Sequence, residues 1–201
     1  MPSRQQDKRS LRRRIRQRRR ALSPVAQRQA AAALRRHIVR FHALACADRI
    51  GAYLPTDGEI DPCPALIELM RRGRCCLLPV IMPGRRPRIR FARVTPNTRL
   101  VVNRLGILEP DLPPRQWLDP RQLDVIFLPL VAFDKWGNRL GRGGAFYDAS
   151  LAAMRQRRHL KRPRLIGLAH ECQQVAHLAT DSWDIPLDGV MTDRRFVPAI
   201  R

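Results

Sequence analysis

The sequence predicts an α/β protein with three layers, in which helices cover both faces of a mainly parallel sheet. Segments with helical spacing alternate along the chain with short apolar runs. The strongest runs, at 74–82 and 123–133, are continuously apolar, as expected of strands that are buried on both faces. The 201 residues contain no internal repeat and no recognisable linker, so we expect one domain over residues 1–201.

The N-terminal part predicts two helices before the first strand. Residues 1–20 carry ten Lys or Arg and one acid, and their apolar residues fall at helical spacing: Leu11, Ile15 and Leu22. This pattern predicts a cationic helix with a narrow apolar stripe. Ser23 is a good N-cap and Pro24 suits the first helical position, so a second helix should span 24–42. We expect its buried face to consist of Val25, Leu34, Ile38 and Phe41.

The remaining elements follow from apolar runs and turn residues. Strands are expected at 48–55, 74–82, 88–94, 123–133 and 163–170. Helices are expected at 62–72, 146–158 and 171–178. The alternation of cationic and apolar residues at 88–94 predicts a half-exposed edge strand. Residues 95–121 contain five prolines and are predicted to be irregular.

The charge is extreme, with a net value of +22. Lys8, Lys135 and Lys161 are the lysines, so 36 of the 39 cationic residues are arginine (39 − 3). This skew, together with abundant alanine and proline, is also what a codon bias would produce. The charge predicts attraction to polyanions, nucleotides included, but does not select among them.

Cysteine usage and hydropathy predict a cytoplasmic protein. The five cysteines are an odd number without a CxxC motif, which favours free thiols in a reducing compartment. No apolar run has the length of a membrane span, and the arginine-rich start lacks the apolar segment of a secretory signal.

The stretch "FDKWGNRLGRGGAFYD", residues 133–148, is the candidate functional loop. It follows a predicted buried strand and precedes a predicted helix, where ligands bind in open α/β sheets. Its glycines let the backbone close on a phosphate, and Arg139 and Arg142 supply bidentate donors. Asp148 is a plausible contact for the Mg²⁺ that accompanies a nucleotide. A glycine-rich turn with solvated arginines explains the same composition equally well.

Two known phosphate-binding patterns are excluded. The loop lacks the GxxxxGK[ST] of a Walker motif. It also fails the dinucleotide-binding pattern GxGxxG, since Phe146 stands three residues after Gly143.

The longer stretch "LPLVAFDKWGNRLGRGGAFYD" closely resembles the signature of 5-formyltetrahydrofolate cyclo-ligases, also called methenyltetrahydrofolate synthetases. The segments "KRSLRRRIRQRR", "YLPTDGEIDP", "GILEP" and "WDIPLDGVMT" resemble further family segments and occur in the family's order. Three positions depart from the pattern. Ala145 replaces the last loop glycine, Phe146 replaces the first of two tyrosines, and Trp183 stands where a histidine often precedes the aspartate.

The resemblance implies a Rossmann-like sheet of the NagB/RpiA/CoA-transferase type. It also implies an enzyme that uses ATP and Mg²⁺ to cyclise 5-formyltetrahydrofolate to 5,10-methenyltetrahydrofolate through a phosphorylated formyl group. The partner is then a small-molecule folate, and we expect a monomer with no specific nucleic acid and no membrane.

The resemblance also assigns residues. The ATP-binding set is Lys8, Arg9, Ser10, Leu11, Arg12, Arg139, Leu140, Gly141, Arg142, Gly143, Gly144, Ala145, Phe146 and Tyr147. The folate-binding set is Leu54, Glu59, Arg142, Gly143, Gly144, Ala145 and Phe146. Arg142 and Tyr147 are implied to be catalytic, and Asp148 and Asp184 to hold Mg²⁺. Without the resemblance, Leu54 reads as a core leucine and Glu59 as a solvated acid.

Two other functions stay open at this point. A nucleic-acid-binding protein could use the arginine-rich N-terminus, although aromatic residues are only 5% of the chain and offer no stacking platform. A family member could also have lost the cyclo-ligase reaction and bind another phosphorylated ligand, and Ala145 and Phe146 are the positions that raise this possibility.

Overall fold

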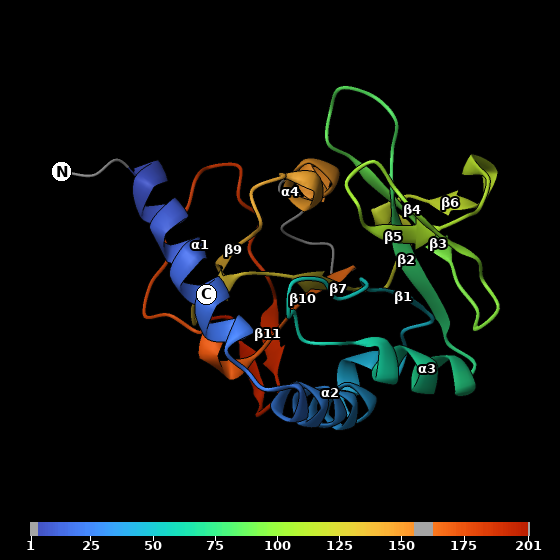
Figure 1. Ribbon diagram of the computed structural model, residues 1–201. Coiled ribbons are helices and arrows are strands. Elements are labelled where there is room, and N and C mark those ends of the chain that lie inside the picture. The colour runs from blue at the N-terminus through green and yellow to red at the C-terminus, as the bar shows by residue number, and fades with distance from the viewer. Residues whose placement is uncertain (1–3, 155–162, 201) are drawn as a thin grey trace.

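The computed structural model describes residues 4–154 and 163–200. Within these ranges a sheet of eight strands crosses the molecule in the order β12-β11-β10-β7-β1-β2-β3-β6 (Figure 1). The strands are β1 (Arg49–Gly51), β2 (Cys75–Ile81), β3 (Ile89–Arg93), β6 (Trp117–Leu118), β7 (Val125–Pro129), β10 (Arg164–Ala169), β11 (Gly189–Thr192) and β12 (Phe196–Pro198).

The centre of the sheet is parallel. Strands β11, β10, β7, β1 and β2 pair in parallel, with Ile50 of β1 opposite Cys76 on one side and Val125 on the other. Strands β12, β3 and β6 add to the two sides in antiparallel orientation. The mainly parallel sheet predicted from the continuous apolar runs is therefore confirmed.

Helices cover both faces of this sheet. Helices α2 (Pro24–Val39) and α3 (Cys63–Arg71) lie on one face, and α4 (Phe146–Leu151) lies on the other (Figure 1). Leu34 and Ile38 of α2 pack with Phe127 of β7 in one core cluster. Leu151 of α4 packs with the opposite sheet face in a second cluster. The three-layer prediction is confirmed.

Local signals explain where α2 begins but not its whole buried face. The Ser23 side chain accepts a hydrogen bond from the Ala26 N–H, and Pro24 stands at the first position, as predicted. We expected Val25 to be buried, but this prediction is wrong, because the residue is 53% exposed. At 3.6 residues per turn, Val25 lies about 180° around the helix from the buried Leu34. Alanines complete the buried face instead.

Three predicted segments differ from the structure because of backbone pairing. Strand β3 is not an edge, because β6 pairs beyond it. Residues 95–121 are not irregular throughout, since β4 (Leu100–Val102) and β5 (Leu108–Pro110) form a hairpin. Asn103 accepts hydrogen bonds from two backbone N–H groups of its turn. The expected helix 171–178 is a single 3₁₀ turn, Glu171–Gln173, after which Val175 N donates to Phe133 O.

The run 123–133 is not one strand. It breaks at residue 130, and β8 (Ala132–Phe133) pairs with β9 (Arg139–Leu140) in a separate two-stranded sheet. The Gln173 side chain donates to the carbonyls of Leu130 and Val131, which replaces the lost strand pairing at the break. Helix α4 ends at Leu151 and continues as a 3₁₀ turn to Met154. The predicted extension to 158 lies outside the described residues.

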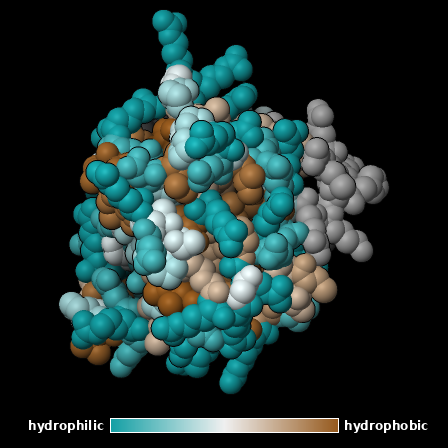
Figure 2. Space-filling view, turned by 90° about the vertical axis from the view of Figure 1, so that its right-hand side faces the viewer, coloured by the Kyte–Doolittle hydropathy of each residue, from teal (hydrophilic) through white to brown (hydrophobic). Residues whose placement is uncertain are grey.

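The surface of the hairpin side mixes polar and apolar residues. Four large apolar side chains of the hairpin and its turn are exposed: Leu100, Val102, Leu105 and Leu108. Figure 2 looks onto this side of the molecule, where brown apolar patches are separated by hydrophilic residues. None of the helices among the described residues has the length and apolar character needed to cross a membrane.

Candidate active site

The candidate site is built from segments that follow the carboxyl ends of three parallel strands. Residues 52–62 follow β1, residues 130–145 follow β7, and residues 170–188 follow β10. Ligand sites of open parallel sheets form at this edge. Helix α1 (Arg4–Arg20) lies across it, and its buried Ile15 packs with Val131, Ala132, Leu140 and Leu178. The predicted apolar stripe of the cationic helix is therefore what fixes α1 over the site.

The polar face of α1 contacts two of these segments. Arg12 Nε donates to the carbonyl of Gly141 at 2.9 Å. Lys8 Nζ lies 2.6 Å from Asp181 Oδ2 and 3.6 Å from Asp184 Oδ2. Arg9 and Ser10, which were also predicted to contact the nucleotide, are exposed, and Ser10 Oγ donates to Asp7 O of its own helix. Arg12 is thus brought to the glycine loop, and Lys8 is brought to the segment that contains Asp181 and Asp184.

The glycine loop starts from a rigid turn. The buried carboxylate of Asp134 accepts hydrogen bonds from the backbone of Trp136, Asn138 and Leu178. At Gly137 a Cβ atom would lie 2.6 Å from the carbonyl oxygen of Leu187, so no larger residue fits. The loop that carries Gly141 to Ala145 is therefore held firmly at its β9 end.

The loop itself contains two residues with left-handed backbone. Gly143 has a φ of 105°, and its missing Cβ would point toward the guanidinium of Arg12, 3.9 Å from Cζ. Ala145 has a φ of 54° and is the N-cap residue of α4, without a side-chain cap. This is the position at which the family pattern has glycine, so the methyl group of Ala145 sits where glycine is favoured.

The strongest contact across the site joins Arg142 to Glu59. Arg142 Nε lies 2.9 Å from Glu59 Oε1, and its Nη2 lies 2.7 Å from Oε2. Nη2 also donates to the carbonyl and hydroxyl oxygens of Thr56. Glu59 is only 6% exposed, so it is not the solvated acid that its composition alone suggested. Burial raises the pKa of Glu59, opposed by the charge of Arg142 and the Thr56 N–H.

A second ion pair links the loop to the start of α4. Arg139 Nη2 donates to Asp148 Oδ1, and Arg139 Nη1 donates to the carbonyl of Ile185. This pairs one proposed metal ligand, Asp148, with a cation and brings it to the segment that contains the other, Asp184. The Asp184 carboxylate accepts the Asp181 N–H at 2.8 Å.

These carboxylates do not form a metal centre by themselves. Among the residues that the structure describes, no group of three or more His, Cys, Asp or Glu could hold a metal ion. Asp148 and Asp184 each face a cationic side chain. Such a donor set fits a Mg²⁺ that is bound mainly by phosphate oxygens and takes one or two carboxylates from the protein.

Three other predicted residues are more enclosed. The hydroxyl of Tyr147 is buried and has no hydrogen-bond partner among the residues that the structure describes. Burial raises its pKa above the ordinary value, and the nearby charge of Glu59 acts in the same direction. Phe146 is half-buried, and its ring would lie 3.0 Å from a Cβ at Gly144. Leu54 is half-buried and packs against the core cluster that contains residues of α2 and α3. This packing agrees with the interpretation of Leu54 as a core leucine.

Sequence reasoning missed the support of the Glu59 segment. The fully buried Arg19 and the left-handed Asp57 hold this segment, and Tyr53 Oη donates to Ile60 O at 2.9 Å. The Asp57–Gly58 dipeptide is a turn signal, and it marks the turn but not the residues that hold it. Arg19 gives no signal of its own, because it stands among many other arginines.

The fold and the site define an α/β enzyme with a cationic loop at the carboxyl edge of its parallel sheet. The model of the 5-formyltetrahydrofolate cyclo-ligase family matches residues 4–193. The chain is 40% identical over 178 residues to the 5-formyltetrahydrofolate cyclo-ligase of Escherichia coli (strain K12), covering 89% of this chain and 96% of that protein. It is 36% identical over 186 residues to that of Haemophilus influenzae, covering 92% and 97%. The chain belongs to the 5-formyltetrahydrofolate cyclo-ligase family.

Solved structures agree with this assignment. The 5,10-methenyltetrahydrofolate synthetase of Aquifex aeolicus superposes with a TM-score of 0.80 at 28% identity, covering 95% of this chain and 92% of that chain. The synthetase of Mycoplasma pneumoniae superposes with a TM-score of 0.71 at 25% identity, covering 93% and 99%. The resemblance seen in the loop and in the order of the motifs is confirmed.

Proposed function

We propose that this protein catalyses the ATP- and Mg²⁺-dependent cyclisation of 5-formyltetrahydrofolate to 5,10-methenyltetrahydrofolate, with release of ADP and phosphate. The observation that carries the proposal is the ion pair between Arg142 and the buried Glu59. This pair joins the loop that would hold the nucleotide to the segment that would hold the folate. The names of the relatives supply the substrate.

The chemistry must turn the formyl oxygen into a leaving group. In the proposed sequence this oxygen attacks the γ-phosphorus of ATP and ADP departs, which leaves an imidate-like phosphate. N10 of the folate then attacks the formyl carbon and loses its proton. The C–O bond breaks, and phosphate carries the formyl oxygen away. Such steps need in-line positioning and charge neutralisation more than a protein nucleophile.

The loop residues supply positioning and charge. Nε and Nη2 of Arg142 bind Glu59, so its Nη1 can face the transferred phosphoryl group. Glu59 would accept hydrogen bonds from pterin N–H groups. Tyr147 would donate its hydroxyl to the reacting group, since its raised pKa keeps the hydroxyl protonated.

The phosphates would lie between α1 and the glycine loop. Arg12 contacts this loop at Gly141, and Lys8 lies beside Asp184. Mg²⁺ would neutralise phosphate charge when bound, with Asp148 and Asp184 as its protein ligands. We further propose that the enzyme is a cytoplasmic, single-domain monomer. Sedimentation velocity of the purified protein tests the oligomeric state, because it reports the mass of the particle in solution.

A spectrophotometric assay tests the proposed function. Protein, 5-formyltetrahydrofolate, Mg²⁺ and ATP are mixed, and the absorbance of methenyltetrahydrofolate is followed. Product should appear only when both ATP and Mg²⁺ are present, with one phosphate released per ring closed. No ATP-dependent product would mean that the chain keeps the family's fold without its reaction.

Variants of Arg142 test the role of the loop. Arg142→Ala should lower kcat/KM at least 100-fold, because both the bidentate pair with Glu59 and the cationic contact to the transferred phosphoryl group are lost. Arg115→Ala is the matched control, since Arg115 is exposed on a distant 3₁₀ turn and should behave as wild type. Full activity of Arg142→Ala would contradict the proposed site.

A further inference from the structure

A buried arginine lies beneath the turn that carries Glu59. Arg19, near the end of α1, is 0% exposed. Its Nη2 donates to the Asp57 carbonyl at 2.6 Å and to Asp57 Oδ2 at 2.9 Å. The proposed reaction gives Arg19 no part, and a buried guanidinium loses much solvation.

Arg19 is poorly satisfied as a purely structural residue. Its Nε and Nη1 are buried without a hydrogen-bond partner in the described structure. An apolar side chain of similar length would avoid this cost, because replacing buried charges by apolar groups is often neutral or stabilising. The buried position of Arg19 is therefore better explained by the segment that it positions than by a contribution to stability.

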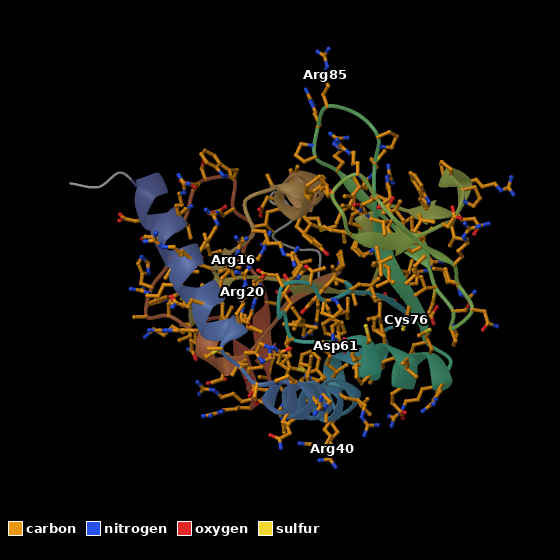
Figure 3. The ribbon with its side chains drawn as sticks, in the orientation of Figure 1. Arg16, Arg20, Arg40, Asp61, Cys76 and Arg85 are labelled. Atoms are coloured by element: carbon orange, nitrogen blue, oxygen red, sulfur yellow. The ribbon has the colours of Figure 1, made fainter. Side chains whose placement is uncertain are left out.

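What it holds is a strained turn. Asp57 has a φ of 56° and Gly58 a φ of 72°, two successive left-handed residues. Aspartate adopts this conformation at a cost, so the surrounding contacts must fix it. Arg20 binds the other carboxylate oxygen of Asp57, and Arg16 Nε lies 3.8 Å from Oδ2. Figure 3 shows Arg16 and Arg20 projecting from α1 toward the centre of the molecule.

The turn leads directly into Glu59. Glu59 N donates to the Thr56 carbonyl at 3.1 Å, and Thr56 N donates to Glu59 Oε2 at 3.2 Å. Thr56 also accepts hydrogen bonds from Arg142. The direction of the Glu59 carboxylate is therefore set by the backbone of Asp57 and Gly58.

We propose that Arg19 is a positioning residue for substrate binding: it holds the Asp57–Gly58 turn so that the Glu59 carboxylate meets Arg142 and the folate. The inference deepens the proposed function and rests on it, because Glu59 contacts the folate only in that function.

The other side of the turn is supported independently. His170, which follows β10 and is 3% exposed, forms a hydrogen bond with the backbone of Gly58. On the α1 side, a Cβ at Gly58 would lie 3.8 Å from the Arg19 carbonyl oxygen. The turn is thus packed between α1 and β10, and Arg19 supplies its charged contact from α1.

The variants Arg19→Met and Arg19→Lys test the proposal. Arg19→Met should raise the KM for 5-formyltetrahydrofolate at least tenfold and leave the KM for ATP within about twofold. Arg19→Lys should recover part of the loss, because a lysine keeps the charge and one donor. Arg18→Met is the matched control: Arg18 is the exposed neighbour of Arg19 on α1, and KM should stay within about twofold.

The pH profile separates positioning from simple loss of structure. The charges that face Glu59 are Arg142 from the loop and Arg19 from α1, and both lower its pKa against the effect of burial. Tyr53 and Tyr147, which interact with Glu59, stay neutral because their own pKa values are raised. Removing the Arg19 charge should shift the acid limb of kcat/KM to higher pH. An unshifted limb, or equal rises in both KM values, would overturn the proposal.

Hydrogen exchange without substrate gives a readout that does not need activity. In Arg19→Met the amides of residues 57–60 should exchange faster, while those of residues 12–17 in α1 stay as in wild type. If wild type makes no product, the proposed function fails, and exchange alone decides whether Arg19 holds the turn. Unchanged exchange at residues 57–60 in Arg19→Met would overturn the inference. So would faster exchange in an active Arg19→Met variant whose KM for 5-formyltetrahydrofolate is the same as that of wild type.

Discussion

Ala145 is the clearest case in which a single residue departs from what its backbone favours. Its φ of 54° lies in the left-handed region, which costs an alanine about 1–2 kcal/mol. Glycine would remove this cost but would lose about 0.4–1 kcal/mol through greater freedom in the unfolded chain. The methyl group is therefore a local destabilisation at the N-cap of α4, within the proposed site.

Ala145→Gly should stabilise the protein by about 0.5–1 kcal/mol, seen as a melting temperature about 1–4 °C higher. Ala149→Gly, in the same helix but with helical backbone, should destabilise it by about 1 kcal/mol. Thermal unfolding of the two variants beside wild type makes the comparison. Equal destabilisation by both substitutions would show that residue 145 is not held in a left-handed conformation.

Glu59 carries the pH dependence expected of the site. Burial raises the pKa of this carboxyl, so protons bind to it at a higher pH than to an exposed glutamate. As pH falls through this raised pKa, Glu59 becomes neutral and its attraction to Arg142 is lost. The value of kcat/KM for the folate should therefore fall as the pH is lowered, and it should do so at a higher pH than that at which an ordinary glutamate titrates.

The variant Glu59→Gln checks this assignment, because glutamine keeps the shape and cannot titrate. Its kcat/KM at neutral pH should be about 10–100-fold lower, as expected for loss of a charged hydrogen bond, and its acid limb should be flattened. An acid limb identical to that of wild type would assign the titration to another group.

At the scale of elements, α1 connects the N-terminal part of the chain to the proposed reaction site. Apolar packing of Ile15 fixes the helix over β8 and β9. This packing places Arg12 beside the glycine loop and Lys8 beside Asp181 and Asp184. A stripe of so few apolar residues should make α1 sensitive to single truncations.

Ile15→Ala should cost about 2–5 kcal/mol, because Ile15 is fully buried and its removal leaves a cavity. The KM for ATP should rise as well, since α1 then holds its cations less firmly. Val25→Ala is the control: Val25 is exposed, and the change should stay within about 0.5 kcal/mol. Urea unfolding of the two variants gives both values, and similar values for the two would contradict the described packing of α1.

Some elements could be predicted from sequence and others could not, for physical reasons. The Ser23–Pro24 signal located α2, and continuous apolar runs identified β2 and β7, because burial on both faces leaves a local pattern. The end of β7 could not be predicted, because it depends on the side chain of Gln173, far along the chain, which binds the carbonyls of Leu130 and Val131 directly after the strand. The short strand β6 has too little local pattern to recognise.

The candidate site could likewise be predicted only in part from the sequence. The glycine loop was readable, since its residues are contiguous. The ion pair between Arg142 and Glu59 joins residues 83 positions apart, so only the family resemblance pointed to Glu59. The buried state of Arg19 could not be predicted, because neighbouring arginines such as Arg18 and Arg20 are exposed.

At the scale of the whole molecule, the net charge of +22 exceeds what one nucleotide needs. Many arginines are exposed, as Arg85 and Arg40 are at opposite ends of the view in Figure 3. We expect such charge to draw in anionic substrates and to bind nucleic acid weakly, with an affinity that salt lowers further. Tight, salt-resistant binding of RNA would instead favour the nucleic-acid function.

The fate of the formyl oxygen tests the account most directly. The wild-type enzyme is given ATP and 5-formyltetrahydrofolate labelled with ¹⁸O in the formyl group, and the released phosphate is analysed by mass spectrometry. The proposed phosphorylation of that oxygen predicts one ¹⁸O atom in each phosphate released. Methenyltetrahydrofolate formed together with unlabelled phosphate would contradict the proposed reaction at this site.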